Sequence, residues 1–226
     1  MALALAASFI LAACSSSEPE PRPDENATIS GRAVVIDGDT IDIGATRVRL
    51  EGIDAPERSQ TCMRADGRDW ACGRAATQGL TKFIAGHHVS CTSQGTDKYG
   101  RTLGLCQVGD TSINQAMIKS GMAWAFVKYS TRYLADEADA QAAHLGVWQG
   151  HSEAPWDYRS KRWQSAEVKS PDGCAIKGNV SAKGRIYHMP WNPWYSKVTI
   201  NAAQGERWFC SEAEAQSAGW RAANGA

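Results

Sequence analysis

The chain has 226 residues and carries 24 Lys and Arg against 24 Asp and Glu, so its formal net charge is zero. This length suits one domain of ordinary size together with a smaller one. The balanced charge argues against a purely electrostatic nucleic-acid binder of the histone type, although it is compatible with an enzyme that has a local basic face.

The charge is nevertheless uneven along the chain. Residues 31–57 hold six acids and three arginines, whereas residues 58–132 hold ten Lys and Arg and four acids. An acidic pocket beside a basic face is unusual for a simple scaffold. It would suit a divalent cation that lies next to an anionic substrate.

The first 13 residues form an apolar run that is too short to span a bilayer as a mature helix. The run ends in Leu11-Ala12-Ala13-Cys14, which resembles the lipobox of a bacterial lipoprotein. The resemblance implies a signal peptide over residues 1–13 and lipidation of Cys14; the alternative is an ordinary secretory signal. Residues 14–28 are expected to form a flexible tether. We therefore expect a lipid-anchored protein of the cell envelope, in the outer membrane or facing the periplasm, or a secreted protein if Cys14 is not lipidated.

Seven cysteines are present, and six remain when Cys14 is set aside. An even number suits disulfides in an oxidising compartment, and the sequence lacks the close C-x-x-C spacing that is typical of a structural zinc site. Neighbouring cysteines suggest the pairs Cys62–Cys72, Cys91–Cys106 and Cys174–Cys210, although six cysteines allow many connectivities.

Residues 29–150 alternate between strand and helix patterns. Because Val and Ile recur there between turn residues, we expect strands at 29–35, 40–43, 47–53, 88–92 and 102–108. Apolar residues at spacings of three and four predict helices at 73–84, 113–120 and 134–145. In the first helix Ala76, Leu80, Phe83 and Ile84 would face the core, and in the last one Leu134, Ala138, Ala142 and Leu145. About five strands with helices between and after them fit a small closed β-barrel.

Three motifs carry a family resemblance. They are V-I-D-G-D-T-I at residues 35–41, V-R-L-E-G-I-D-A-P-E at residues 48–57 and D-K-Y-G-R at residues 97–101. In this order and at these spacings they resemble the thermonuclease (staphylococcal nuclease) family, over a stretch from about residue 29 to residue 148. The resemblance implies an OB-fold, a barrel of about five strands with about three helices. It also implies calcium-dependent cleavage of phosphodiester bonds in DNA and RNA.

The resemblance assigns a Ca²⁺ site to oxygen ligands. It implies that Asp39 and Asp54 ligate Ca²⁺ together with the backbone carbonyl of Ala55, and that Asp37 orients waters on the metal. Gly38 would let the backbone turn tightly enough to aim both acids inward. Taken alone, the D-G-D sequence is typical of an ordinary surface turn.

The resemblance also assigns the catalytic side chains. Glu57 would activate or position the attacking water, and Arg49 and Arg101 would grip the phosphate, for which the planar guanidinium is suited. The alternatives are a solvated Glu57 that follows a proline and an outward-facing Arg49 that pairs with Glu51.

Substrate contacts are expected next to these residues. Asp97, Lys98 and Tyr99 would build the turn that presents the arginine of the third motif, and Lys98 would touch a substrate phosphate. The family has a pair of tyrosines on which bases stack, and only Tyr129 matches, with Val127 at the other place.

The C-terminal part differs in character from the barrel. We expect a connector over residues 151–172 and a small α+β module over residues 173–223, with a helix at 211–218 that begins with the capping box of Ser211 and Glu214. Segments such as G-E-R-W-F-C-S-E-A-E-A resemble a small module, called a sunset-type domain, that is sometimes fused to such nucleases. Its tryptophans would form either a small core or a sugar- or nucleotide-binding face.

Two classes of function remain, with a weaker third. The first is a lipid-anchored, calcium-dependent nuclease that hydrolyses DNA and RNA with little sequence preference and with no obligate protein partner indicated. The second is a non-catalytic nucleic-acid-binding module on the same barrel. The third is an envelope-polysaccharide-binding protein that uses the C-terminal module. The joint presence of Arg49, Glu57, Arg101, Asp39 and Asp54 favours the enzyme.

Overall fold

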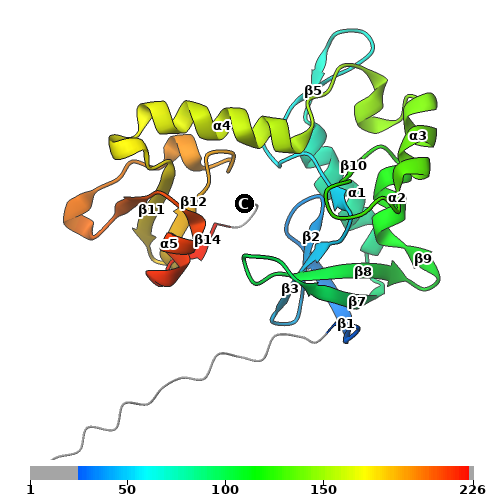
Figure 1. Cartoon of the computed structure of the whole chain (residues 1–226), viewed down its shortest axis with the longest axis horizontal. Coiled ribbons are helices and arrows are strands. Elements are labelled where there is room, and N and C mark those ends of the chain that lie inside the picture. Colours follow the sequence, from blue (N-terminus) through cyan, green and yellow to red (C-terminus); the bar gives the residue numbers. More distant parts are fainter. Residues whose placement is uncertain (1–24, 224–226) are drawn as a thin grey trace, which may run out of the picture.

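The computed structural model describes residues 25–223, which form a β-barrel unit and a smaller C-terminal unit joined by helix α4 (Pro155–Lys169) (Figure 1). The expected signal peptide, the lipidation of Cys14 and residues 14–24 of the expected tether lie outside the described residues. None of the helices in the described part of the chain combines the length and the apolar character needed to cross a bilayer.

Five strands close the barrel: β1 (Thr28–Val35), β2 (Thr40–Ile43), β3 (Thr46–Leu50), β7 (His88–Thr96) and β8 (Thr102–Val108). Neighbouring strands pair antiparallel in the order β3-β2-β1-β7-β8, and a parallel pairing of β3 with β8 joins the two edges. Closure removes the open sheet edges that would otherwise expose unpaired backbone groups. The predicted five-stranded barrel with helices is therefore confirmed.

Shorter elements complete this unit. They are β4 (Ile53–Asp54), β5 (Cys62–Met63), β6 (Asp69–Trp70), α1 (Cys72–Ile84), β9 (Thr111–Ser112), α2 (Ile113–Lys119), β10 (Trp124–Ala125), α3 (Leu134–Ala142) and a 3₁₀ turn at Gly146–Gln149. The barrel strands alternate between core and outside, so that on β3 Val48 and Leu50 are buried whereas Arg47 and Arg49 lie on the other side.

The structure corrects three of the predicted details. The strand expected at 47–53 ends at Leu50, because Gly52 has a φ of 75° and turns the chain before β4 begins. Helix α1 buries Ala76, Leu80 and Ile84, but Phe83 lies at the edge of that stripe and is 37% exposed.

The third correction concerns helix α3, which ends at Ala142 rather than at residue 145. Its one buried residue is Ala140, whereas Leu134 and Leu145 are exposed, so the predicted apolar stripe is wrong. The helix ends early because His144 adopts a left-handed φ of 51°. Tyr133, just before the helix, supplies the buried contact with the barrel instead.

The C-terminal unit is a small sheet with one helix packed on it. Its strands are β11 (Ile176–Ser181), β12 (Gly184–His188), β13 (Arg207–Phe209) and β14 (Arg221–Ala222), in the order β13-β11-β12-β14. Short 3₁₀ turns lie at Pro171–Gly173, Tyr195–Lys197 and Ala202–Gln204. Helix α5 (Glu212–Ser217) begins as predicted, with the Ser211 hydroxyl accepting a hydrogen bond from the Glu214 amide.

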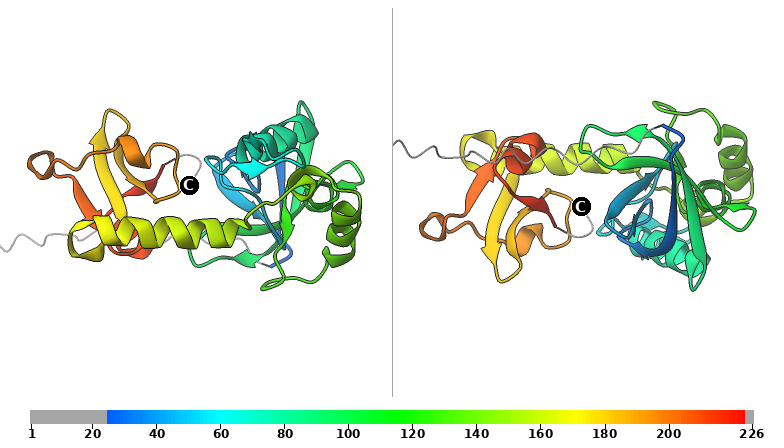
Figure 2. Two further views of the ribbon diagram at one scale, coloured as in Figure 1. Left: turned by 90° about the horizontal axis from the view of Figure 1, so that it is seen from above. Right: turned by 90° about the horizontal axis from the view of Figure 1, so that it is seen from below.

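The tryptophans of this unit differ in how deeply they are buried. Trp220 is buried in its core with Tyr187 and Phe209, and Trp191 packs against that core, but Trp194 is 55% exposed. The segment expected to be a connector is mostly the helix α4, which extends from the barrel unit to the C-terminal unit in both views of Figure 2.

All three suggested disulfides are present. Cys62–Cys72 ties the β5–β6 hairpin to the start of α1, and Cys91–Cys106 links directly opposed residues of β7 and β8. Cys174–Cys210 joins the segment before β11 to the residue after β13. Cross-links of this kind restrict the unfolded chain and so favour the folded one.

Candidate active site

The turn between β1 and β2 places Asp39 beside the end of β3. The Asp39 carbonyl accepts a hydrogen bond from the Leu50 amide (2.8 Å), and the Asp39 amide donates to the Asp37 carboxylate (3.2 Å). A Cβ on Gly38 would lie 2.7 Å from Ala55 Cβ and 2.9 Å from Ala76 Cβ. Glycine is therefore required here by close packing rather than by an unusual backbone angle.

Asp54 comes from β4, which pairs with β10 and holds the Asp54 side chain with no exposed surface. Arg49 connects Asp54 to the β1–β2 turn that carries Asp39. Its Nη1 donates to Asp39 Oδ1 (2.7 Å) and its Nη2 donates to Asp54 Oδ1 (2.8 Å). Arg49 thus pairs with the two predicted metal ligands and not with Glu51, which settles the alternative left open by the sequence.

A second arginine reaches the same carboxylates from outside the barrel. Arg159 on α4 donates from Nη1 to Asp54 Oδ1 (3.1 Å) and Glu57 Oε1 (2.8 Å), and from Nη2 to Asp54 Oδ2 (2.7 Å). Both oxygens of Asp54 therefore accept hydrogen bonds from guanidinium groups. Arg159 is not among the site residues predicted from the sequence.

A signal for Arg159 is nevertheless present in the sequence. Trp156, Arg159 and Trp163 follow one another at spacings of three and four, which places them on one face of a helix. Trp156 stacks on Phe126 of the barrel (ring centroids 5.5 Å apart), and Trp163 packs against the core of the C-terminal unit. The helix that bridges the units thus carries Arg159 toward the acidic residues.

Burial and mutual repulsion shift the titration of the acids. Desolvation, together with the charges of Asp39 and Glu57, raises the pKa of Asp37 to about 8. Desolvation raises the pKa of Glu57 to about 7, although Arg159 opposes that rise. Burial alone would raise the pKa of Asp39, but Arg49 and the hydrogen bond from the Ala55 amide (2.8 Å) outweigh it, so the pKa is lowered.

The carboxylates in turn shift the pKa values of the two arginines. Burial alone would lower the pKa of Arg49 and of Arg159, yet their carboxylate partners raise both values above the ordinary one. Both arginines are therefore charged, and together they offset part of the negative charge of the acids around them.

The turn at residues 97–101 presents the second predicted phosphate-binding arginine. Asp97 accepts hydrogen bonds from the amides of Tyr99 (2.9 Å) and Arg101 (3.0 Å), as expected of a turn former, and its other oxygen accepts from Arg101 Nε (2.7 Å). The guanidinium of Arg101 and the ammonium of Lys98 both lie over the Tyr99 ring, 5.3 and 4.7 Å from its centroid.

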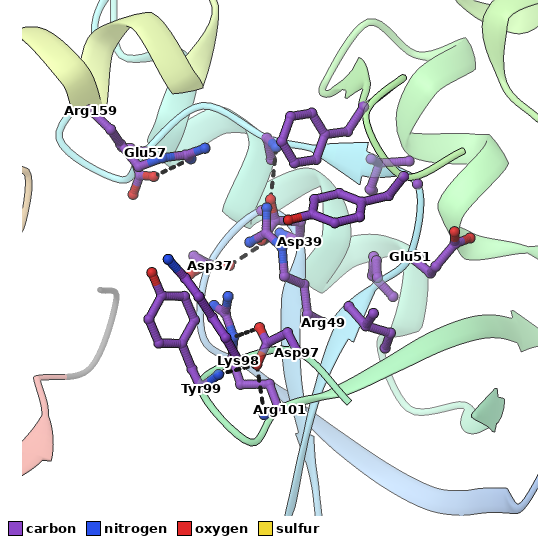
Figure 3. Close-up of a pocket in the computed structure, with 18 of the residues that line it drawn as sticks. Asp37, Asp39, Arg49, Glu51, Glu57, Asp97, Lys98, Tyr99, Arg101 and Arg159 are labelled. Atoms are coloured by element: carbon purple, nitrogen blue, oxygen red, sulfur yellow. Dashed lines mark hydrogen bonds and ion pairs between the residues drawn. The ribbon is translucent and has the colours of Figure 1, made fainter. Parts of the chain in front are cut away.

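These residues line one pocket of about 470 Å³ between the barrel and the C-terminal unit. Figure 3 shows the carboxylates of Asp37, Asp39 and Glu57 and the side chains of Arg49 and Arg101 around it. The barrel also supplies Lys98, Tyr99 and Tyr129, and the C-terminal region supplies Arg159, Met189, Trp191 and Glu212. Asp54 lies beneath this lining, covered by the two arginines that bind it.

The donor atoms suit a hard divalent cation. Two carboxylates that share one guanidinium lie close enough to share a cation, and Ca²⁺ prefers oxygen ligands of this kind. Within residues 25–223, no group of three or more His, Cys, Asp or Glu side chains has the arrangement of a metal site. A site here would therefore need the Ala55 carbonyl and water beside the two acids. Arg159 would have to leave Asp54, and Arg49 would have to release the oxygens of Asp39 and Asp54 to which it donates.

Comparison with known proteins identifies the barrel. The sequence model of the family described as staphylococcal nuclease homologue matches residues 47–150. An uncharacterized endonuclease of Escherichia coli O157:H7 is 34% identical over 145 residues, which cover 60% of this chain and 88% of the relative. The chain belongs to the staphylococcal nuclease family.

Two other similar proteins are named as a nuclease and as a protein of polysaccharide biosynthesis. A micrococcal nuclease of Shigella flexneri is 35% identical over 143 residues, or 55% of this chain and 76% of the relative. The succinoglycan biosynthesis protein ExoI of Rhizobium meliloti (strain 1021) is 37% identical over 131 residues, or 55% of this chain and 67% of the relative. The family called ArfC matches residues 155–222, so Arg159 belongs to the part of the chain that carries the second match.

Proposed function

We propose that this staphylococcal nuclease homologue is a calcium-dependent endonuclease that hydrolyses phosphodiester bonds of DNA and RNA with little sequence preference. The observation that carries the proposal is the convergence of Asp39, Asp54 and Glu57 with Arg49 on one pocket, with Arg101 at its rim. Family membership and relatives named as nucleases support the same reaction class.

In this account each side chain has a distinct task. Glu57 accepts a proton from the attacking water, while Arg49 and Arg101 hold the phosphate and offset the charge that develops on its oxygens. Asp39, Asp54 and the Ala55 carbonyl would hold Ca²⁺, and Asp37 would order water beside them. When bound, the cation polarises the phosphoryl group and lowers the charge that the arginines must offset.

The same proposal places the protein in the cell envelope. It rests on the lipobox-like Leu11-Ala12-Ala13-Cys14 and on the three disulfides, which suit an oxidising compartment. A lipid on Cys14 would hold the enzyme at a membrane, and DNA and RNA outside the cytoplasm would be its substrates.

Tyr129 is the expected stacking platform for a substrate base. It is 63% exposed at the pocket, and its ring lies edge-on to Phe126, which in turn stacks on Trp156. We expect Tyr129→Ala to weaken binding of a single-stranded oligonucleotide by about 5- to 150-fold, because one base stack contributes about 1–3 kcal/mol. Tyr129→Phe should bind like the wild type in a fluorescence-anisotropy titration; equal affinity in all three proteins would remove Tyr129 from the binding site.

The substrate range can be tested with a labelled DNA single strand and an RNA of the same sequence. Incubation with the purified protein and Ca²⁺ should cut both strands at many internal positions, giving a ladder of fragments on a denaturing gel. If the folded protein binds both strands but cuts neither, the proposal fails in favour of a non-catalytic binding module.

A further inference from the structure

Helix α4 is fixed to the loop that carries Glu57. The Ser59 hydroxyl hydrogen bonds with the Tyr158 hydroxyl (3.0 Å) and donates to the Trp191 carbonyl (2.7 Å), and the Gln60 side chain donates from Nε2 to the Glu153 carbonyl (2.7 Å). These contacts hold the start of α4 and the Trp191 segment against residues 57–60. The position of Arg159 beside the acids is therefore set by docking that does not involve Arg159 itself.

The buried carboxylates of Asp54 and Glu57 explain why an arginine is stable at position 159. Asp54 has no exposed side-chain surface, and Glu57 is only 12% exposed, so each needs a positive partner when it is ionised. Arg49 serves Asp39 and one oxygen of Asp54. Arg159 donates to both oxygens of Asp54 and, in addition, to Glu57.

The hydrogen bonds from Arg159 to Asp54 compete with the binding of a cation by Asp54. Arg159 donates to both Asp54 oxygens, which are the atoms that the proposed Ca²⁺ site requires. A guanidinium and a divalent cation a few ångströms apart repel each other, so each lowers the occupancy of the other. The Arg159 side chain borders the pocket, and the Ser59 and Gln60 contacts that dock α4 do not use it, so its release from Asp54 would not require α4 to undock.

We propose that Arg159 is a positioning residue of the active site that holds Asp54 and Glu57 in place when no cation is bound and competes with Ca²⁺ for Asp54. The proposal rests on the proposed calcium site and assigns the C-terminal region a role in it. Cation binding would thus be linked to the conformation of a side chain that lies outside the barrel.

The test is Ca²⁺ binding to the full chain by isothermal titration calorimetry, with wild type, Arg159→Gln, Arg159→Lys and Arg162→Gln. Arg162 is an exposed arginine on the same helix and provides the matched control. Coupling between two ligands usually amounts to about 5- to 150-fold in affinity. We expect Arg159→Gln to bind Ca²⁺ more tightly within that range, Arg159→Lys to lie between it and wild type, and Arg162→Gln to match wild type.

A second readout is the unfolding temperature, measured without and with Ca²⁺. In excess chelator Arg159→Gln should unfold at a lower temperature than wild type, because Asp54 and Glu57 lose a partner, and Ca²⁺ should raise its midpoint by more than it raises that of wild type. Unchanged or weaker Ca²⁺ affinity in folded Arg159→Gln would overturn the inference while leaving the nuclease intact. If neither protein bound Ca²⁺, the proposed calcium site would fail, and this inference with it.

Discussion

Replacing Glu57 by glutamine should lower the single-turnover rate of DNA cleavage by about 10²- to 10⁴-fold, which is the usual contribution of a positioned general base. The amide is nearly the same size as the carboxylate and can remain beside Arg159, but it cannot accept a proton from water. Because Glu57 is not among the proposed cation ligands, Ca²⁺ affinity should change much less than the rate. The measurement is a quenched single-turnover assay with saturating enzyme and Ca²⁺.

Glu51→Gln provides the matched control for this prediction. Glu51 is a half-buried carboxylate on the neighbouring turn, and Arg132 is the basic residue that influences it. It lines the same pocket, but it lies apart from Glu57 and Arg159 in Figure 3. Its variant should cleave DNA at close to the wild-type rate. A Glu57→Gln protein that is folded and equally fast would show that another group handles the water.

Replacing Arg101 by glutamine should lower kcat/KM for DNA by about 10²- to 10³-fold, the range observed when one preorganised donor to a developing charge is removed. Arg101 donates from Nε to Asp97, and neither of its Nη atoms donates a hydrogen bond within the described chain. Those two groups therefore remain for a phosphate, and Asp97 sets the direction in which they point.

The fold of the variant should survive, because Asp97 still accepts hydrogen bonds from the Tyr99 and residue-101 amides. Arg101→Lys should restore only part of the activity, since an ammonium lacks the planar fork. Arg47→Gln, which removes a partly exposed partner of Asp42, is the control and should stay near wild type. An Arg101→Gln enzyme with unchanged kcat/KM would exclude Arg101 from the phosphate site.

Much of the barrel and of its site was predictable because the signals are local. The alternation of Val48 and Leu50 with Arg47 and Arg49 fixes which side of β3 faces the core, and the structure follows it. Strand pairing then brings the Asp39 turn beside β3. Hydrogen bonds within one turn likewise place Arg101, because the Asp97 carboxylate accepts from the amides of Tyr99 and Arg101.

What could not be predicted depends on contacts between distant segments. Arg159 lies 105 residues from Asp54 in sequence, and no motif connects the two. Its role follows from the docking of α4 through Ser59 and Trp156, which is a tertiary event. Helix α3 shows the same limit, because its apolar spacing predicted a buried stripe, whereas Ala140 is its one buried residue and Tyr133, just before the helix, packs in the barrel core.

The proposed function requires that this pocket cleave nucleic acid with the help of a bound cation. The most direct test measures initial rates of single-stranded DNA cleavage by wild type and Glu57→Gln, first in excess EDTA and then after Ca²⁺ is added in excess over the chelator. We predict no cleavage in EDTA, recovery on adding Ca²⁺ to wild type, and little recovery in the variant. Cleavage that persists in EDTA and is equal in the two proteins would contradict the account.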